Sequence, residues 1–167
     1  MSFVFTPIRK LAMGDSVDAF DCGQPELNRY IQRYAWINQK ANSAQTYVAC
    51  AGSEIAGYYS LSVAGVEHGG TPDRIAKGLA KHPVPVMLLA RLAIDLKCQG
   101  QGLGTALLKD ALLRTVQAAD IAGIRALLVH AKDEAARQWY LKFDFEPGPV
   151  NPMHLFLLLK DIQHAVR

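Results

Sequence analysis

One segment constrains the fold more than any other: between residues 84 and 119 a long apolar run, a glycine-rich turn and an amphipathic stretch follow one another. The run Val84–Ile94 has prolines near its start, and its length and apolar character predict a central strand. After glycines at positions 100, 102 and 104, apolar residues recur at four-residue spacing and predict a helix over 102–119 with a wide apolar face. We therefore expect a strand, turn and helix unit that packs the helix on a sheet.

The other periodic segments alternate between strand and helix patterns. A helix is expected from Gln24 and Pro25 to about Asn38, and two strands over 46–51 and 55–63 form an antiparallel hairpin around Gly52 and Ser53. Later segments predict a strand over 125–130, a helix over 133–141 capped by Asp133, and a last strand over 154–159. This order indicates a mixed α/β fold in one domain over residues 1–167.

Composition narrows the class of protein. A chain of 167 residues that is 50% hydrophobic and 20% charged is long enough to bury one core, and a formal net charge of +3 does not by itself indicate a nucleic-acid partner. The start has no signal-peptide pattern and no apolar run is long enough to span a bilayer, so we expect a soluble, cytoplasmic protein. Three widely separated cysteines, Cys22, Cys50 and Cys98, are expected to be free thiols.

The glycine turn is an expected anion site, because free helix N-terminal amides and close backbone approach suit a pyrophosphate. A P-loop would need Gly-x-x-x-x-Gly-Lys-Ser/Thr, which is absent, and Gly100, Gly102 and Gly104 do not give the dinucleotide spacing Gly-x-Gly-x-x-Gly. A purely structural connection between strand and helix remains the alternative.

The string Gln99-Gly100-Gln101-Gly102-Leu103-Gly104 resembles the Arg/Gln-x-x-Gly-x-Gly/Ala acetyl-CoA motif of the GNAT acetyltransferase superfamily. The resemblance implies a mostly antiparallel central sheet flanked by helices, with acetyl-CoA as co-substrate. It also implies that the preceding strand pairs with the pantetheine arm and holds the thioester carbonyl. The implied acetyl-CoA contacts are Leu92, Ala93, Ile94, Gln99, Gly100, Gln101, Gly102, Leu103, Gly104 and Thr105.

A second signature of the superfamily, Ala-x-x-x-Tyr-x-x-x-Gly-Phe, resembles the segment from Ala136 through Tyr140 to Phe145, where Asp144 replaces the usual glycine. By resemblance, Tyr140 is the general acid that protonates the departing CoA thiolate. An aromatic that only anchors its helix in the core is the alternative. His130 is a possible base or a structural histidine, and the scattered His68, His82, His154 and His164 lead us to expect no metal.

The likeness narrows to the TacT/AtaT-type toxins of toxin–antitoxin modules. The segment 20–30 resembles their amino-terminal Phe-x-Cys-Gly-x-x-x-Leu-Asn signature, and the segments 58–62 and 89–95 resemble their next two strands. This resemblance implies acetyl transfer to the α-amine of aminoacyl-tRNA, which blocks translation, together with a ribbon-helix-helix antitoxin and a homodimer. A GNAT enzyme acting on a small amine or a protein amino terminus, and a non-catalytic acetyl-CoA sensor, are the alternatives.

An acceptor RNA would need cations for its phosphates. Arg91, which precedes the thioester-holding strand, is the first candidate, and an ion pair within the fold is its alternative role. For the other basic residues, solvated faces of ordinary surface helices are the alternative. These further candidates are Arg33, Lys40, Lys77, Lys81 and Lys97.

Overall fold

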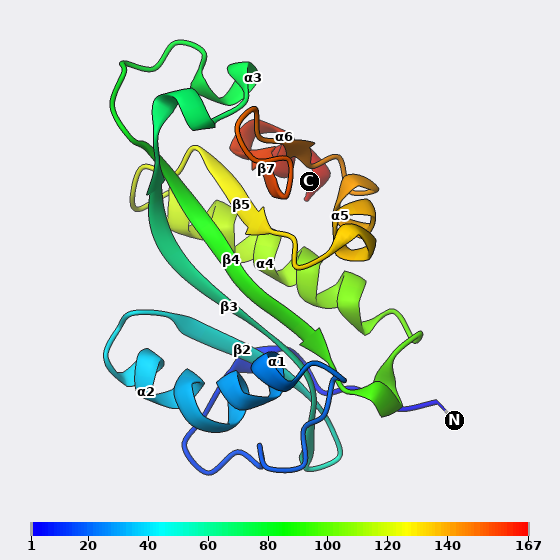
Figure 1. The fold of residues 1–167 in the computed structure, drawn as a ribbon. Helices are drawn as coiled ribbons and strands as arrows, with labels where there is room; N and C mark the ends of the chain where they lie inside the picture. Colours follow the sequence, from blue (N-terminus) through cyan, green and yellow to red (C-terminus); the bar gives the residue numbers. More distant parts are fainter. Residues whose placement is uncertain (1, 167) are drawn as a thin grey trace. The chain divides into compact units, whose positions relative to one another are not determined.

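A computed structural model describes residues 2–166 (Figure 1). Seven strands form one sheet in the order β1-β2-β3-β4-β5-β7-β6. The β4–β5 pair is parallel, whereas β1–β2, β2–β3, β5–β7 and β6–β7 are antiparallel. The predicted α/β fold with a mostly antiparallel sheet is confirmed. The strands are β1 (Arg9–Lys10), β2 (Gln45–Ala51), β3 (Glu54–Val66), β4 (Val84–Ile94), β5 (Ala126–His130), β6 (Glu146–Pro147) and β7 (His154–Leu158).

The chain divides into two compact units. The first contains the residues up to Ser62 and Ala90–Ala111, and the second contains Val63–Leu89 and the residues from Leu112 onward. Strands β3 and β4 and helix α4 (Leu103–Ala119) each contribute residues to both units. No helix within residues 2–166 has the length and apolar character needed to cross a membrane.

In the first unit, three helical segments follow one another without a break: α1 (Pro25–Arg29), the π-helix η1 (Tyr30–Tyr34) and α2 (Ala35–Lys40). Pro25 occupies the first turn, where its missing N–H is no loss. The predicted helix is confirmed, although it continues to Lys40. The π turn was not predicted, because a single widened turn leaves too little periodicity to detect in a sequence.

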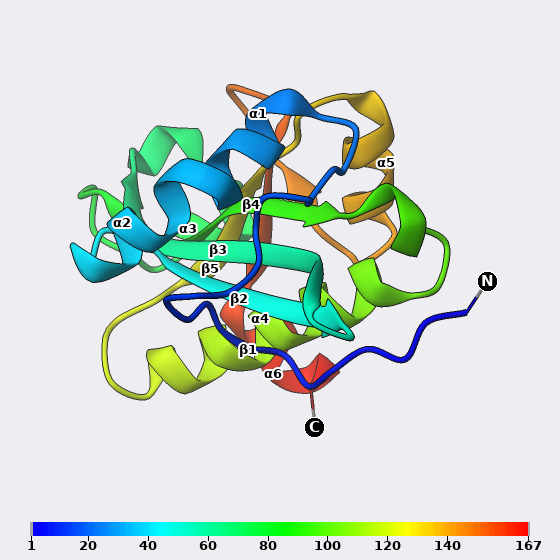
Figure 2. The same ribbon diagram turned by 90° about the horizontal axis from the view of Figure 1, so that it is seen from below.

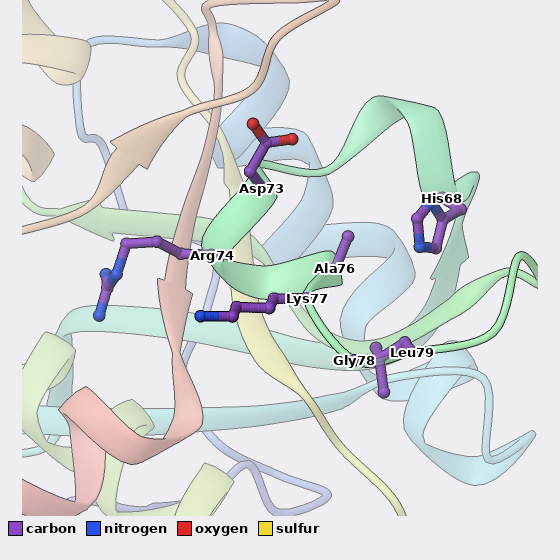
Figure 3. A pocket seen from close by; sticks show the side chains of 7 residues that line it. All are labelled: His68, Asp73, Arg74, Ala76, Lys77, Gly78 and Leu79. Carbon is purple, nitrogen blue, oxygen red and sulfur yellow. The ribbon is translucent and has the colours of Figure 1, made fainter.

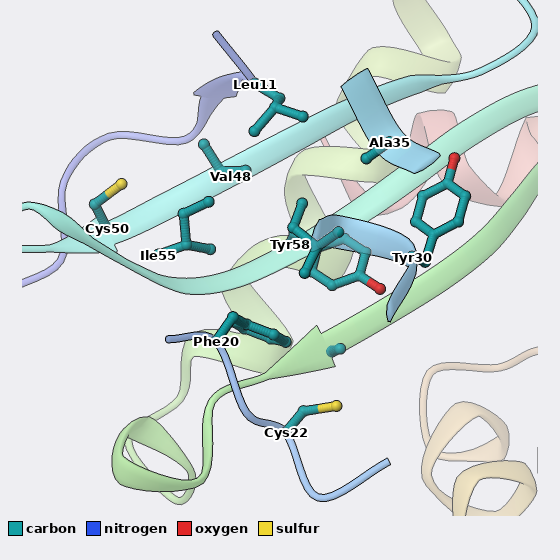
Figure 4. Close-up of a cluster of buried hydrophobic side chains, with 11 residues drawn as sticks. Leu11, Phe20, Cys22, Tyr30, Ala35, Val48, Cys50, Ile55 and Tyr58 are labelled. Carbon is teal, nitrogen blue, oxygen red and sulfur yellow. The ribbon is translucent and has the colours of Figure 1, made fainter. Parts of the chain in front are cut away.

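The three helical segments pack on one face of β2 and β3, and the α4 residues of this unit lie on the other face (Figure 2). Phe20 meets the ring of Tyr58 edge-on at 5.5 Å, and Tyr30 stacks on the same ring at 6.3 Å. The Tyr58 hydroxyl donates to the Leu27 carbonyl at 2.7 Å. Figure 4 shows this core, whose buried members are Leu11, Phe20, Cys22, Tyr30, Ile31, Ala35, Val48, Cys50, Ile55, Tyr58 and Ala93.

The predicted hairpin is present, and strand β3 runs three residues further than expected, to Val66. Gly52 in its turn has a φ of +61°. On the α4 side of β3, the buried Tyr59 hydroxyl donates to Asp110 at 2.5 Å, which fixes α4 to the strand. The three cysteines, Cys22, Cys50 and Cys98, are free and buried.

The second unit has its own core around β5 and β7, with α5 (Glu134–Leu141) and α6 (Leu159–Ala165) (Figure 1). The predicted strand over 154–159 ends at Leu158, because Leu159 begins α6. The short helix α3 (Asp73–Ala76) is held by Arg125, whose guanidinium donates to the carbonyls of Ile75 and Lys77 at 2.8 and 3.1 Å. The sequence did not predict α3, α6, β1 or β6, which are too short for a clear periodic pattern.

Replacement of Gly57 by alanine tests the packing of α4 on β3. A Cβ at Gly57 would lie 2.9 Å from Ile94, 3.0 Å from Leu107 and 3.1 Å from Leu103. We expect Gly57→Ala to lower the free energy of unfolding by about 1–2 kcal/mol, because three side chains must move within a packed layer. Gly69→Ala is the control, since a Cβ there meets no atom within 4 Å, and it should change stability by less than about 0.5 kcal/mol. Equal urea midpoints for the two variants would contradict the expected close packing.

Candidate active site

The turn between β4 and α4 has the geometry of an anion cradle. The 3-10 helix η3 (Leu96–Cys98) follows β4, and then Gly100 and Gly102 adopt φ values of +75° and +83°. A Cβ at either glycine would meet no atom within 4 Å, so open space adjoins the backbone there. The residues present therefore fit a bulky anion such as a pyrophosphate, which glycine allows to approach the chain closely.

The first turn of α4 supplies the hydrogen-bond donors for such an anion. Ala106 N donates to Gly102 O at 3.1 Å, as the first helical bond of this turn. The amides of Leu103, Gly104 and Thr105 precede it and have no acceptor within the helix. Together with the positive end of the helix dipole, these amides favour a bound anion.

The two glutamines of the turn hold its shape. Gln99 Nε2 donates to Ile94 O at 3.0 Å and to Cys22 O at 3.5 Å. Gln101 Oε1 accepts from Phe3 N at 2.9 Å. Both side chains were predicted as acetyl-CoA contacts, and the structure shows them bonded to the backbone of neighbouring segments. The Gln99 side chain ties the start of the turn to the end of β4.

The sequence reasoning missed Asp95 as a side chain that orders this region. Asp95 is only 4% exposed, and its carboxylate accepts from Lys97 N at 3.0 Å and, through its other oxygen, from Asp21 N at 3.1 Å. Leu96 N donates in turn to Asp21 O at 2.8 Å. One carboxylate therefore caps η3 and binds the segment that leads into α1. An aspartate directly after a strand is a capping signal that could have revealed part of this role.

The same contacts explain the signature over 20–30. Asp21 Oδ1 accepts from Gly23 N at 2.9 Å and from Asn28 Nδ2 at 3.0 Å, and these two bonds lower the pKa of the Asp21 carboxyl below its ordinary value. Asn28 Oδ1 accepts from Cys22 N at 2.8 Å. Gly23 has a φ of +87°. The signature thus specifies a hydrogen-bonded loop that is attached to the glycine turn through Asp95.

Among the predicted cations, those of the first unit differ in their partners. The guanidinium of Arg91 lies 3.7 Å from the centroid of the Tyr30 ring. Arg33 and Lys40 are exposed and form no ion pair with any residue from 2 to 166. Lys97 pairs with Glu54 at 3.2 Å, and this hydrogen bond raises the pKa of the Lys97 ammonium. Lys97 would have to leave Glu54 to contact an acceptor.

In the second unit, Tyr140 lies in α5, whose N-terminus is capped as predicted by Asp133, with Oδ1 accepting from Ala136 N at 2.8 Å. Its ring meets those of Trp139 and Phe145 edge-on at 5.0 and 5.4 Å. Tyr140 is 8% exposed, and burial raises the pKa of its phenol. Its hydroxyl forms no hydrogen bond within the described part of the chain. The arrangement is that of a protonated donor without a structural partner.

Asp144 stands at the position where the signature that this segment resembles has glycine. Its φ is +69°, in the left-handed region that a glycine adopts without strain. Aspartate tolerates this region better than most side chains. The backbone at Asp144 therefore has a conformation that a glycine would also adopt.

His130, the candidate base, pairs across the sheet with His154, and their rings stack at 4.0 Å and 19°. Desolvation, followed by the charge of His154, lowers the pKa of His130. His130 is thus expected to be neutral near pH 7, which is the form a base requires. No cluster of three or more potential metal ligands occurs within residues 2–166.

The remaining cations lie near α3, where a cavity of about 430 Å³ opens (Figure 3). Lys77 lines it, and Lys81 is exposed beyond it in the sequence. Arg74, another lining residue, is paired with Asp161 at 3.1 Å and Glu146 at 3.6 Å. The full lining is His68, Asp73, Arg74, Ala76, Lys77, Gly78 and Leu79.

Comparisons with known proteins agree with this geometry. The family described as acetyltransferase (GNAT) domain matches residues 42–147. A "tRNA-acetylating toxin" of Mycobacterium tuberculosis (strain ATCC 25618 / H37Rv) is 44% identical over 158 residues, which cover 95% of each chain.

Two solved structures are similar over almost the whole length at 28% identity. The AtaT toxin complexed with acetyl-methionyl-tRNAfMet has a TM-score of 0.89, with 98% of this chain and 100% of that chain covered. A tyrosine-to-phenylalanine variant of AtaT, bound to the C-terminus of the antitoxin AtaR and to acetyl-CoA, has a TM-score of 0.81, with 96% and 97% covered. With a glycine turn that suits a pyrophosphate and a family match over most of its length, this chain belongs to the GNAT acetyltransferase family.

Proposed function

We propose that this chain is a toxin that transfers the acetyl group of acetyl-CoA to the α-amine of aminoacyl-tRNA and so blocks translation. The observation that carries the proposal is the likeness to a tRNA-acetylating toxin, at 44% identity over 95% of both chains. The open glycine turn supports the donor, and the AtaT complexes with acetylated tRNA and with acetyl-CoA support both substrates. An enzyme of this kind would act in the cytoplasm, where tRNA is charged.

Different residues of the turn and the preceding strand would make different contacts with acetyl-CoA. The amides of Leu103, Gly104 and Thr105 would bind the pyrophosphate, with Gly100 and Gly102 giving it room. Gln99 and Gln101 keep the turn in shape. Acetyl-CoA would supply an activated acetyl thioester, and the backbone of Leu92, Ala93 and Ile94 would align it.

Tyr140 would hold the proton that the departing thiolate needs. A phenol with the ordinary tyrosine pKa of about 10 is already protonated at neutral pH, and burial raises the pKa of Tyr140 further, so its hydroxyl is available as an acid. The absence of a hydrogen bond from its hydroxyl to any described residue supports this role over that of a core anchor, which usually finds a partner when buried.

The incoming amine needs little help to lose its proton. An α-amine has a pKa of about 8, and esterification of the neighbouring carboxyl lowers it further. A dedicated protein base is therefore not required, although the lowered pKa of His130 leaves its imidazole neutral and able to accept a proton.

The similarity to AtaT also supports a proposal for the macromolecular partners of this chain. The AtaT variant described above is bound to the C-terminus of the antitoxin AtaR, and we infer that a ribbon-helix-helix antitoxin likewise binds this chain and that the toxin is a homodimer. Arg33, Lys40, Lys77 and Lys81 would contact tRNA phosphates.

The acceptor is tested by offering the purified chain acetyl-CoA with charged tRNA, with deacylated tRNA, with small amines and with peptides that have a free amino terminus. We expect CoA release and N-acetylation only with charged tRNA. Acetylation of amines or peptides without any acetylation of charged tRNA would instead identify an ordinary GNAT enzyme.

Gly102→Ala tests the donor cradle. A Cβ at this position enters the open space where the anion would lie and strains a residue with φ +83°. We expect the KM for acetyl-CoA to rise about tenfold or more, as for loss of a charged hydrogen bond. Gly14→Ala is the matched control, because Gly14 has φ +94° and equally open surroundings in a different turn. If both variants change the KM equally, backbone strain alone explains the effect and the cradle is not at Gly102.

Tyr140→Phe tests the acid. We expect kcat to fall about a hundredfold or more, while the Kd for acetyl-CoA stays unchanged, because only the proton donor is removed. Tyr59→Phe also removes a buried phenolic hydroxyl, one that donates to Asp110, and should lower stability without a comparable loss of rate. Wild-type turnover in Tyr140→Phe would leave Tyr140 as a core aromatic only.

The pH profile of kcat/KM also tests whether Tyr140 is the acid. The rate should rise as the substrate amine loses its proton, with a midpoint at or below about pH 8. It should then stay level to at least about pH 9.5, because the raised pKa of Tyr140 keeps the acid protonated beyond the ordinary tyrosine value of about 10. A fall centred below pH 9 would argue against a buried tyrosine as the acid. A separate rising limb below about pH 6.5 that disappears in His130→Asn would identify His130 as the base.

A further inference from the structure

Arg91 is a half-buried cation whose charge has no counterpart in the described chain. Its guanidinium rests on the face of Tyr30 at 3.7 Å. It forms no hydrogen bond or ion pair with any residue from 2 to 166, so the ion pair expected as the alternative role is not present there. Partly buried charges are normally paired, and an unpaired one indicates an anion supplied from outside the chain.

The orientation of this guanidinium is fixed by a rigid support. Tyr30 is only 4% exposed, it stacks on Tyr58, and its hydroxyl accepts from Asn38 Nδ2 at 3.3 Å. A guanidinium stacked on a ring keeps its in-plane N–H donors free, and their fork matches the oxygens of a carboxylate or a phosphate. Tyr30 also begins the π-helix η1, a widened turn of a kind that often occurs at functional sites.

Arg91 also lies close to the donor end of its strand. It precedes Ile94 by three residues of β4, or about 10 Å along the strand. Ala93 belongs to the same core cluster as Tyr30, whereas the side chain of Ile94 lies on the α4 side next to Gly57. Arg91 therefore shares the face of Ala93, the face covered by the helices α1 to α2.

We propose that the Arg91–Tyr30 pair is a phosphate-binding site for the acceptor, and that it holds the phosphodiester next to the terminal nucleoside that carries the amino acid. This inference rests on the proposed function. An amino acid esterified to RNA has no free carboxylate, so a backbone phosphate is the nearest anion that such an acceptor offers to a guanidinium fork. Arg33 in η1 and Lys40 at the end of α2, both exposed and unpaired within residues 2–166, extend the cationic path along the same helices.

The test compares two acceptors that differ only in one phosphate: an amino acid esterified to adenosine, and the same amino acid esterified to adenosine 5′-monophosphate. The wild type should prefer the phosphate-bearing acceptor about tenfold in kcat/KM, the effect of one charged hydrogen-bonded contact. Arg91→Gln should bring this ratio close to one. The preference should also weaken as salt is added to the wild type.

Matched variants separate this role from a structural one. Tyr30→Phe keeps the ring and should keep the ratio, whereas Tyr30→Leu removes the ring face and should lower it. Arg91→Lys keeps the charge but loses the planar fork, and should give an intermediate ratio. This variant serves as the test if Arg91→Gln folds poorly. Lys10→Gln removes one exposed charge from the edge strand β1 and should leave the ratio at the wild-type value.

A wild-type ratio near one, or a ratio that Arg91→Gln and Arg91→Lys leave unchanged, would overturn the site. Failure of the proposed function would give a different result from failure of the phosphate site. In that case neither adenosine ester would be acetylated, whereas small amines or peptides would be.

Discussion

The carboxylate of Asp95 is the interaction on which the rest of the first unit depends. It accepts a backbone N–H from Lys97, at the start of the glycine turn, and another from Asp21, in the loop that leads into the helices. A buried carboxylate that lost either bond would leave an unsatisfied group at a cost of about 1–3 kcal/mol. The turn assigned to the donor and the helices assigned to the acceptor therefore share one rigid attachment, and Gln99 reinforces it from the other side of the turn.

The proposed binding of acetyl-CoA and the proposed proton transfer need few specific side chains. Binding a pyrophosphate uses backbone amides and a helix dipole, and the only demand on the sequence is glycine where φ is positive. Proton donation to a thiolate needs one group that stays protonated at neutral pH. A tyrosine with an ordinary pKa of about 10 meets this need, and burial raises the pKa of Tyr140 further. The proposed recognition of the acceptor would need more, because it would use cations that have no ion-pair partner within residues 2–166, among them Arg91 on the Tyr30 ring.

Much of this could be predicted from the sequence, because the decisive features are local. The apolar run Val84–Ile94, the glycine spacing and the apolar stripe of α4 gave the correct strand, turn and helix, and Asp133 capped α5 as expected. Short elements such as α3 and β6 lack a periodic pattern, and the π turn at Tyr30 differs from an α-helix only in its hydrogen bonds. The contact between Arg91 and Tyr30 joins residues 61 positions apart, as their numbers show. No pattern within either segment encodes it.

The most direct test of the central claim is mass spectrometry of total charged tRNA after brief expression of the chain, with nuclease digestion to release the terminal aminoacyl-adenosines. We expect aminoacyl-adenosines that carry one acetyl group on the α-amine in cells expressing the wild type, and none in cells expressing Tyr140→Phe at the same level. Unmodified aminoacyl-adenosines in both, accompanied by newly acetylated small amines or protein amino termini in the wild type alone, would contradict it.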